Sequence, residues 1–348
     1  MINYLKLLWG YVVKYVVSVG IIWGAMQIIT YFKVDLLKNY MGSLWYLIYL
    51  MPIPFLSVAA FIEVAIKCPV EGWVAKINNI IGDAKLYGEI KVEPTVEIVG
   101  QFKLTEDQEV EASNVRAGLK INDAHAMIYE EPSLALAPIK FNVETLDYAA
   151  LTVLRRQNLH GYILSANSVI ICSERRLLIV HHRAKKSATY EGKLHTVGGS
   201  YQPIGVFPNK EGDRYSLIRT AHREADEEIQ ASILTEDIPP MILGLEPSTK
   251  FIQLVFLGAN ISEKQCDKLI SNWEGEGVVK IPFDELESRL TKPIFIIDSN
   301  GKEQEIKWVP TGKAAILAWL AFGAPNAGIR ASFGGYSPKE LFNKIVGK

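Results

Sequence analysis

Three glutamates in the segment His222–Ile229 have the types and the spacing to bind a cation. On a helix, Glu224, Glu227 and Glu228 stand at positions i, i+3 and i+4, so their carboxylates converge on one side. Carboxylates that close repel one another unless a cation or bound protons offset the charge. Oxygen ligands of this kind suit Mg²⁺ or Mn²⁺, and Mg²⁺ commonly brings phosphates with it. The segment therefore predicts a metal site that faces phosphates.

The surrounding residues predict a helix over about Asp213–Ile229 that holds these carboxylates. Its apolar stripe consists of Leu217, Ile218, Ala221, Ala225 and Ile229. Glu228 falls at the edge of the stripe, Glu224 lies just beyond it, and Glu227 lies further round. Arg223 stands one turn before Glu227 and can steer it by a charge-assisted hydrogen bond. A solvated charged face is the other interpretation of such a string.

Glycines and basic residues upstream of this helix extend the predicted site. A strand is predicted over Leu194–Gly199, and the pair Gly198 and Gly199 at its end permits close approach of the backbone to a ligand. His182 and Arg183 follow a core strand and are candidates for phosphate contact, with a solvated basic loop as the alternative. The same basic segment also contains His181, Lys185 and Lys186. The order strand, glycine pair, loop and acidic helix favours the metal site over the charged face.

Hydrophobic periodicity predicts two regions around this site, in an α+β fold class. Residues 68–157 form a small β-rich linker domain, because Leu86, Gly88 and Ile90 alternate with polar neighbours. Residues 158–348 mix strands and helices and contain the acidic helix. The elements predicted beyond those above are a helix at Leu146–Gln157, a hairpin of Val169–Cys172 with Leu177–Val180, strands at Phe251–Leu257 and Val278–Ile281, a capping-box helix from Ser262, and helices at Phe283–Leu290 and Gly312–Phe322.

Two apolar runs at the start of the chain have the length and composition of membrane spans. Tyr15–Phe32 contains no charged residue and, as a helix, is roughly 27 Å long, close to the ~30 Å of a hydrocarbon core. Leu44–Ile66 is longer and carries one charge, Glu63, while Pro52 and Pro54 predict a kink. The pair predicts a two-helix transmembrane module. A signal peptide followed by a core helix, or two buried helices of a soluble domain, are the alternatives.

The charges that flank this module, residues 1–67, predict its orientation. Lysines lie at both outer ends and in the connecting loop, and the bias favours both termini in the cytoplasm. Glu63 lies within about one turn of the predicted boundary, where a side chain can snorkel to the interface. The alternative is a functional lining or packing residue inside the span.

Overall charge and cysteine content exclude some classes of function. The chain has 348 residues and a formal net charge of −1 at pH 7. That balance gives no sign of a nucleic-acid-binding tail or a polybasic lipid anchor. The three cysteines are scattered and lack CxxC spacing, which predicts reduced thiols rather than a disulfide framework or a zinc site.

The acidic helix resembles a Nudix box, the pattern G-x5-E-x7-R-E-U-x-E-E-x-G-U in which U is bulky and apolar. Arg223 and Glu224 match its R-E positions, and Ala225 occupies the first U. Glu227 and Glu228 match its E-E positions, and the glycine pair resembles the glycines that precede the box. The resemblance extends over about residues 161–322. It implies a Nudix-like α/β/α sandwich with a mixed sheet, in which the three glutamates bind Mg²⁺ and help to activate water for attack on a diphosphate.

The chain also departs from this pattern. Tyr215 stands where the upstream glutamate belongs, eight residues before Arg223, and Gln230 replaces the closing glycine. The last U is only Ala231, and the loop between the glycines and the helix is longer than in a compact box. A divergent site of this kind is open to two interpretations. It hydrolyses a diphosphate with Glu227 as the catalytic carboxylate, or it binds a phosphodiester without cutting it.

The two-helix module, the β-rich linker and the divergent Nudix-like region together resemble one family. These are the transmembrane Nudix effectors of bacterial CBASS anti-phage systems, called CD-NTase-associated protein 16, with a SMODS-associated Nudix domain. The resemblance implies a multi-pass protein of the bacterial inner membrane whose soluble domain lies in the cytoplasm. It implies a receptor for a cyclic oligonucleotide made by a partner CD-NTase synthase, with no nucleic-acid polymer as a partner.

In this family the implied output is abortive infection, in which the bound effector oligomerises and disrupts the membrane. A lone two-helix hairpin cannot enclose an aqueous pore, so several copies in the lipid bilayer would be required. Two alternatives stay open. One is a membrane-anchored, Mg²⁺-dependent Nudix hydrolase of a nucleoside diphosphate derivative, and the other is a membrane tether whose Nudix-like fold binds only protein.

Overall fold

A computed structural model of the chain describes the region that carries the acidic helix. The described residues are 72–119, 124–129, 139–157, 161–185, 190–203, 216–233, 240–271, 275–297, 303–326 and 333–347. Residues Trp73–Lys348 form one unit. The predicted spans Tyr15–Phe32 and Leu44–Ile66, with Glu63, lie outside the described residues. Within the described part of the chain, no helix has the length and apolar character needed to cross a bilayer.

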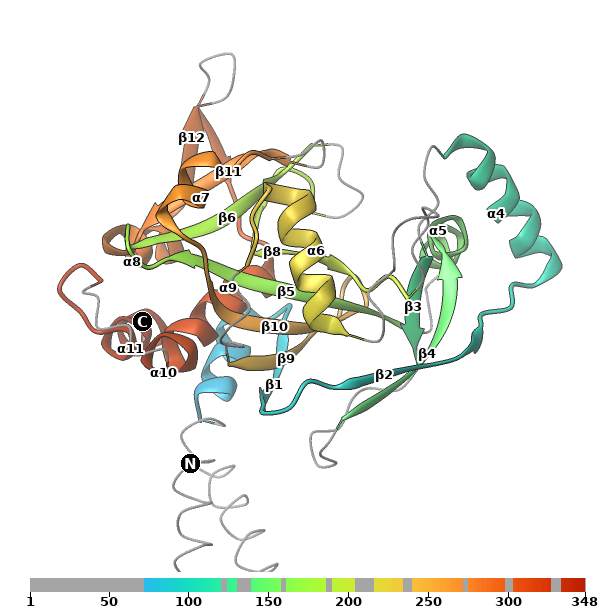
Figure 1. Ribbon diagram of the computed structural model, residues 1–348, viewed down its shortest axis with the longest axis horizontal. Helices are drawn as coiled ribbons and strands as arrows, with labels where there is room; N and C mark the ends of the chain where they lie inside the picture. Colours follow the sequence, from blue (N-terminus) through green and yellow to red (C-terminus); the bar gives the residue numbers. More distant parts are fainter. Residues whose placement is uncertain are drawn as a thin grey trace, which may run out of the picture. The chain divides into compact units, whose positions relative to one another are not determined.

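A mixed β-sheet lies at the centre of this unit (Figure 1). Its strands are β1 (Lys85–Ile90), β2 (Thr95–Gln101), β3 (Ala124–Ile128), β4 (Lys140–Asp147), β5 (Tyr162–Cys172), β6 (Leu177–Arg183), β7 (Leu194–His195), β8 (Val197–Ser200), β9 (Met241–Glu246), β10 (Phe251–Asn260) and β11 (Gly275–Pro282). The strand order is β1-β9-β10-β5-β3-β4-β2, with β8 paired to β5, and with β6 paired to β5, β7 and β11. β10 pairs with β5 and β2 with β4 in parallel, and the other pairs are antiparallel. A separate two-stranded sheet joins β12 (Ile294–Ile297) and β13 (Glu303–Ile306).

Helices pack on both faces of the large sheet. They are α4 (Glu106–Gly118), α5 (Tyr148–Arg156), α6 (Leu217–Ile229), α7 (Glu263–Lys268), η1 (Phe283–Glu285), α8 (Leu286–Thr291), α9 (Pro310–Ala318), η2 (Trp319–Gly323), α10 (Ala324–Asn326) and α11 (Pro338–Val346). Residues 72–81 are helical as well. Successive side chains of a strand point to opposite faces, so Leu164 of β5 packs with Leu217 of α6, while Ile163 packs with Leu151 of α5. This layering agrees with the sandwich expected for residues 158–348, and Figure 1 shows α6 lying across β5 and β10.

Strands from the expected linker domain are part of the same sheet. β1 pairs with β9, with Lys85 opposite Leu245, and β3 pairs with β5, with Met127 opposite Ile163. The division at residue 157 therefore passes through a continuous sheet. Local alternation identifies β1 as a strand, but it carries no information about which strand will be its partner.

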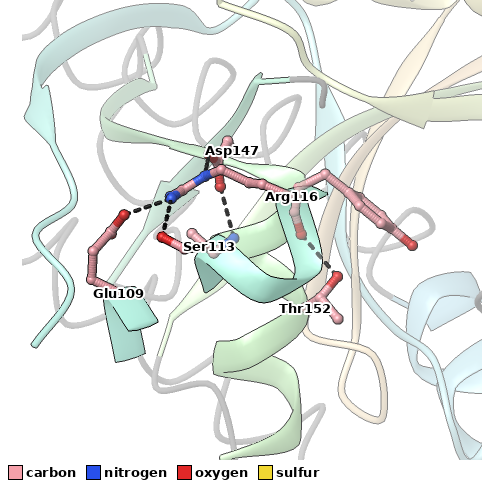
Figure 2. A network of polar contacts seen from close by, with 7 residues as sticks. Glu109, Ser113, Arg116, Asp147 and Thr152 are labelled. Atoms are coloured by element: carbon pink, nitrogen blue, oxygen red, sulfur yellow. Dashed lines mark hydrogen bonds and ion pairs between the residues drawn. The ribbon is translucent and has the colours of Figure 1, made fainter. Parts of the chain in front are cut away.

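The helices α4 and α5 are joined by a network of polar side chains (Figure 2). Arg116 of α4 donates from Nε to Asp147 at 2.5 Å and from Nη1 to Glu109 at 2.5 Å. The other oxygen of Asp147 accepts the backbone N–H of Ala150 at 2.7 Å and so caps the start of α5. The two carboxylates raise the pKa of Arg116 above its ordinary value. One carboxylate thus caps the start of α5 and holds α4 against it.

Several local expectations are confirmed. β5 and β6 form the predicted hairpin, with Ile170 opposite Ile179, and Ser262 begins α7 with the predicted capping box. The predicted helix Gly312–Phe322 corresponds to α9, which starts two residues earlier, at Pro310, because proline is well suited to the first helical turn. The predicted strand Leu194–Gly199 is two strands, since β7 pairs with β6 and β8 pairs with β5. The chain changes partner between them, at Thr196.

Candidate functional site

The acidic helix α6 is capped by a residue from the expected linker region. Ser216 is the N-cap, and its hydroxyl accepts the backbone N–H of Arg219 at 3.3 Å. One carboxylate oxygen of Glu93 accepts both the hydroxyl of Ser216 and the backbone N–H of Ile218, each at 2.9 Å. The first turn of α6 has no acidic residue of its own, so Glu93 supplies the negative charge that a helix N-terminus favours.

The predicted apolar stripe of α6 is confirmed. Leu217, Ala221, Ala225 and Ile229 are buried, and Ile218 packs at the edge of the core. The carboxylates then follow in the predicted order of burial. Glu228 is 2 % exposed and Glu224 is 8 % exposed, while the side chain of Glu227 is 35 % exposed. The interpretation as a fully solvated charged face is therefore wrong for two of the three glutamates.

Arg223 brings Glu224 and Glu227 to one point. Its Nη1 atom donates to Glu224 Oε1 at 2.8 Å and to Glu227 Oε2 at 3.0 Å. Its Nη2 atom donates to the backbone oxygen of Ser200, at the end of β8, at 2.9 Å. The guanidinium itself is only 15 % exposed, so these charge-assisted bonds form in a partly desolvated setting. The steering of Glu227 by Arg223 that the sequence predicts is present, and it includes Glu224.

The glycine pair of β8 makes room for this arrangement. A Cβ atom on Gly199 would lie 2.4 Å from the carboxyl carbon of Glu224. A Cβ atom on Gly198 would lie 1.9 Å from the side-chain oxygen of Asn167 and 2.4 Å from the backbone oxygen of Ala166, both on β5. The close approach that these glycines permit is therefore made by the protein's own α6 and β5. The prediction assigned that approach to a ligand.

Glu228 faces the interior of the sheet rather than the point shared by the other two carboxylates. Its Oε2 atom accepts the backbone N–H of Gly198 at 3.1 Å. Its Oε1 atom lies 3.5 Å from Nδ1 of His181, a β6 residue that is 1 % exposed. The Nε2 atom of the same ring lies 3.2 Å from the hydroxyl of Ser271. The third glutamate is thus held by two strands.

Three of the basic residues singled out in the sequence, His181, His182 and Arg183, lie in β6 rather than in a solvated loop. Lys185 lies in the turn after the strand, and Lys186 lies outside the described residues. His182 is 4 % exposed, and its Nδ1 atom lies 4.0 Å from Glu276. Burial lowers the pKa of His182 below its ordinary value. Because neighbouring residues of a strand point to opposite faces, His182 faces away from His181 and Glu228. Arg183 ends the strand, and its backbone N–H donates to Lys193 at 3.0 Å. Of this segment, the structure brings His181 to the glutamates.

The donor set at α6 fits a divalent cation in type. Two carboxylates already converge on one positively charged nitrogen, and a cation in place of that nitrogen would meet two hard oxygen donors. Glu224 and Glu227 would then hold it. The predicted three-carboxylate set differs here, because both oxygens of Glu228 are directed at Gly198 and His181. As the side chains lie, no group of three or more His, Cys, Asp or Glu residues in the described ranges is arranged around a metal position.

The helix α6 ends at Gln230 in a left-handed backbone conformation. Gln230 adopts a left-handed conformation, with φ 55° and ψ 38°, and its N–H closes the helix onto Ala225 and Asp226. Glycine adopts left-handed backbone without steric cost, which is why it is favoured at the end of a helix. Gln230, noted in the sequence as standing where the Nudix pattern has glycine, therefore adopts a conformation that glycine adopts at lower cost.

Two functional contacts were missing from the sequence-based prediction. Glu93 lies in the connection after β1, far along the chain from α6, and no local pattern links the two. His181 was grouped with a basic loop, although the apolar run before it continues the strand. The unbroken apolar run Leu177–Val180 was the available signal, because a strand continued from it places His181 and His182 on opposite faces.

Solved Nudix structures are similar to parts of this chain. A MutT protein from Methanosarcina mazei Go1 is 20% identical over 36% of this chain and 81% of that chain, with a TM-score of 0.29. A NUDIX hydrolase from Nitrosomonas europaea is 14% identical over 46% of this chain and 89% of that chain, with a TM-score of 0.30. The NUDIX domain of Shewanella oneidensis NrtR, complexed with ADP ribose, is 14% identical over 36% of this chain and 77% of that chain, with a TM-score of 0.28.

No family model matches the chain, and no curated protein matches it either. Similarity at TM-scores of 0.28 to 0.30 carries no argument about activity or ligand. The functional proposal is therefore based on the contacts of α6.

Proposed function

We propose that the α6 site binds a phosphorylated nucleotide through a divalent cation, and that the full chain is a membrane effector gated by a cyclic oligonucleotide. The observation that carries the proposal is the convergence of Glu224 and Glu227 on one cationic nitrogen of Arg223. A buried and a partly exposed carboxylate beside a guanidinium can bind Mg²⁺, and the metal and the guanidinium together attract phosphate oxygens. This supports a Nudix-like phosphate site.

Binding without hydrolysis is supported by the state of the carboxylates. A catalytic base has to be reachable by water, but Glu228 is 2 % exposed and is directed at Gly198 and His181. Glu227 is reachable, yet its Oε2 atom already accepts a hydrogen bond from Arg223 at 3.0 Å. A site of this kind favours holding a ligand, and the difference in affinity between two assembly states would transmit the signal.

The output at the membrane is the part of the proposal that rests on the sequence. The spans at Tyr15–Phe32 and Leu44–Ile66 would anchor the chain in the bacterial inner membrane, with the unit that begins at Trp73 in the cytoplasm. Ligand binding would drive several copies into a homo-oligomer whose helices disrupt the bilayer, which causes abortive infection. A CD-NTase synthase would supply the cyclic oligonucleotide.

The test combines the full chain with cyclic di- and trinucleotides in cells that lack other anti-phage systems. We expect growth arrest and entry of a membrane-impermeant dye only when the chain and its activating nucleotide are both present. Deletion of residues 1–66 should abolish dye entry and leave nucleotide binding intact, as measured by calorimetry. Glu227→Gln should abolish nucleotide binding, and with it dye entry, while the variant still reaches the membrane. Killing by the fragment that lacks the spans would overturn the proposal.

A membrane-anchored Mg²⁺-dependent hydrolase is the second candidate, and the exposure of Glu227 favours it. At 35 %, the Glu227 side chain is the accessible carboxylate among the three glutamates. Mg²⁺ held there would supply Lewis-acid stabilisation of a diphosphate. The role of Glu227 would then be to accept a proton from water.

This candidate predicts Mg²⁺-dependent release of a nucleoside monophosphate from a nucleoside diphosphate derivative. Glu227→Gln should abolish the release, whereas Asp226→Asn, an exposed neighbour on the same helix, should leave it unchanged. The absence of turnover across a panel of nucleotide diphosphates would reject the hydrolase and leave the receptor standing.

A further inference from the structure

His181 carries a buried polar atom that the fold does not otherwise use. Its Nδ1 atom is inaccessible to solvent and forms no hydrogen bond within the described ranges. Glu228 Oε1 lies 3.5 Å away, and both side chains are almost completely buried, at 1 % and 3 % exposure. Buried polar atoms in native proteins are nearly always satisfied, so an unsatisfied ring nitrogen that faces a carboxylate needs a physical reason.

The ring of His181 is fixed from both sides. Its backbone lies in the sheet between partners on two strands, His195 of β7 and Val278 of β11. Its Nε2 atom lies 3.2 Å from the hydroxyl of Ser271. When that hydroxyl donates to Nε2, a neutral imidazole carries its proton on Nδ1. The Nδ1–H group then faces Glu228.

Glu228 is fixed from its other side by β8, because its Oε2 atom accepts the N–H of Gly198 at 3.1 Å. The carboxylate therefore lies between a backbone donor on β8 and a ring donor on β6. Glu228 directly follows Glu227 on α6, so the contacts that hold Glu228 also hold the turn of the helix that carries Glu227.

We propose that His181 is a positioning residue for Glu228, and that through Glu228 it sets the cation affinity of the α6 site. This inference rests on the proposed function, since it requires a cation at Glu224 and Glu227. His181 does not touch the ligand. Its Nδ1–H fixes the orientation of Glu228. With Glu228 fixed, α6 holds the other two glutamates where they can bind the cation.

Binding of Mn²⁺ alone to the purified full-length chain tests the idea, with free Mn²⁺ measured by electron paramagnetic resonance. His181→Phe removes the donor, and we expect its Mn²⁺ affinity to fall about 2- to 30-fold, the range for a residue that acts on a site through others. His181→Asn places an amide N–H near the position of Nδ1 and should restore most of the affinity. His125→Phe is the matched control, because His125 is another buried histidine of the same sheet and its ring nitrogens are also unpartnered within the described part of the chain. It should bind Mn²⁺ like the wild type.

The outcomes separate the two proposals. If His181→Phe binds Mn²⁺ like the wild type, or if His181→Asn and His125→Phe lose as much affinity as His181→Phe, the positioning role is overturned. If wild-type binding is unaffected by Glu227→Gln, there is no cation at α6, and the proposed function falls together with this inference. Should His181→Phe fail to fold, Ser271→Ala replaces it. That variant removes the hydroxyl beside Nε2 and should weaken Mn²⁺ binding in the same direction.

Discussion

Gln230 ends α6 in a backbone conformation that costs free energy for any residue with a side chain. Its φ of 55° is left-handed, and the side chain is exposed, so the amide group has no buried contact to lose. Gln230→Gly should therefore raise the free energy of unfolding by about 1 kcal/mol, the usual penalty for left-handed backbone. Urea unfolding of the purified chain at an unchanged m-value measures it.

The control for this prediction keeps a Cβ atom. Gln230→Ala retains the left-handed strain while removing the rest of the side chain, so it should leave the urea midpoint almost unchanged. If alanine stabilises the chain as much as glycine does, the gain comes from loss of the glutamine side chain, and the backbone argument is wrong.

The two glycines of β8 predict different consequences of the same substitution. Gly199→Ala would press a methyl group against the Glu224 carboxylate, which is the end of a flexible side chain and can move away from Arg223. Gly198→Ala would press one against the backbone of β5, which cannot move alone. We expect Gly199→Ala to lose Mn²⁺ affinity with little loss of stability. Gly198→Ala should lose about 2 kcal/mol or more of stability through overpacking.

Thermal melting and Mn²⁺ titration of both variants check this pair. Equal losses of stability would show that β8 is equally constrained at both positions. An unchanged Mn²⁺ affinity in Gly199→Ala would show that the position of Glu224 does not matter for the cation.

His125 makes stability depend on pH. Burial, helped by the positive charges of Arg155 and Arg223, lowers the pKa of His125 from 6.5 to about 4. The unfolded chain takes up a proton below pH 6.5 and the folded chain does not until about pH 4, so stability is complete above pH 6.5 and falls as the pH drops toward 4. By the size of this shift, the loss is up to about 3 kcal/mol. His125→Phe should make the fall of melting temperature between pH 6.5 and 4 shallower.

The pKa values of other histidines are lowered as well, so His125→Phe should reduce the slope of melting temperature against pH without abolishing it. Burial also lowers the pKa of His182, His195 and His222. His222→Gln is a suitable comparison because its ring is only partly buried, and it should flatten the profile less than His125→Phe does. An unchanged slope in His125→Phe would contradict the assigned cause.

At the scale of the elements, one carboxylate takes part both in the start of α5 and in its contact with α4 (Figure 2). Asp147 caps α5 and pairs with Arg116 of α4. Asp147→Ala should lower the free energy of unfolding by about 2 kcal/mol, because it removes a helix cap and a charge-assisted bond together. Asp147→Asn should lose only about half as much, because it keeps the cap. Urea unfolding measures both.

Glu109→Gln is the matched control, since Glu109 contacts the same guanidinium at the exposed end of the network. Exposed ion pairs contribute little, so this variant should change the urea midpoint only slightly. A loss in Glu109→Gln as large as that in Asp147→Ala would show that the ion pairs of Arg116, and not the cap of α5, hold the two helices.

Elements with a strong local signal were predictable, and those defined by partners were not. The stripe of α6, the β5–β6 hairpin and the capping box at Ser262 all follow from residues within one or two turns of each other. The break between β7 and β8 does not, because it arises when the chain moves from β6 to β5. The pairing of β3 with β5 joins residues more than thirty positions apart.

The same distinction explains the candidate site. The relative burial of the three glutamates follows from a helical wheel, and so does the contact of Arg223 with Glu227. The direction of Glu228 toward His181 depends on which strand lies beneath the helix, and this is a property of the sheet. The sequence supplied the residues of α6 itself, and the fold added the groups from β6, β8 and the Glu93 connection.

At the scale of the whole molecule, the strands between residues 85 and 147 complete the sheet. β1 covers the edge of β9, β3 pairs with the end of β5, and Glu93 caps α6. On the face opposite α6, a buried cluster joins the two regions. Its residues are Met127, Leu146, Ala150, Leu151, Leu154 and Ile163. The site on α6 therefore depends on the region that the sequence presents as a separate domain.

Two fragments of the chain test this dependence. Fragment 73–348 keeps every strand of the sheet and should melt cooperatively. Fragment 158–348 loses β1 and β3 and uncovers Ile163 and Phe251, which pack against α5 in the full fold. Each large side chain that loses its cover costs about 2 kcal/mol of burial, and an exposed edge at β9 invites pairing with other chains. We expect fragment 158–348 to aggregate and to bind no Mn²⁺ that depends on Glu227. If it instead melts cooperatively with the Mn²⁺ affinity of fragment 73–348, then the boundary at residue 157 is a true domain boundary, and β1, β3 and Glu93 are dispensable to the site.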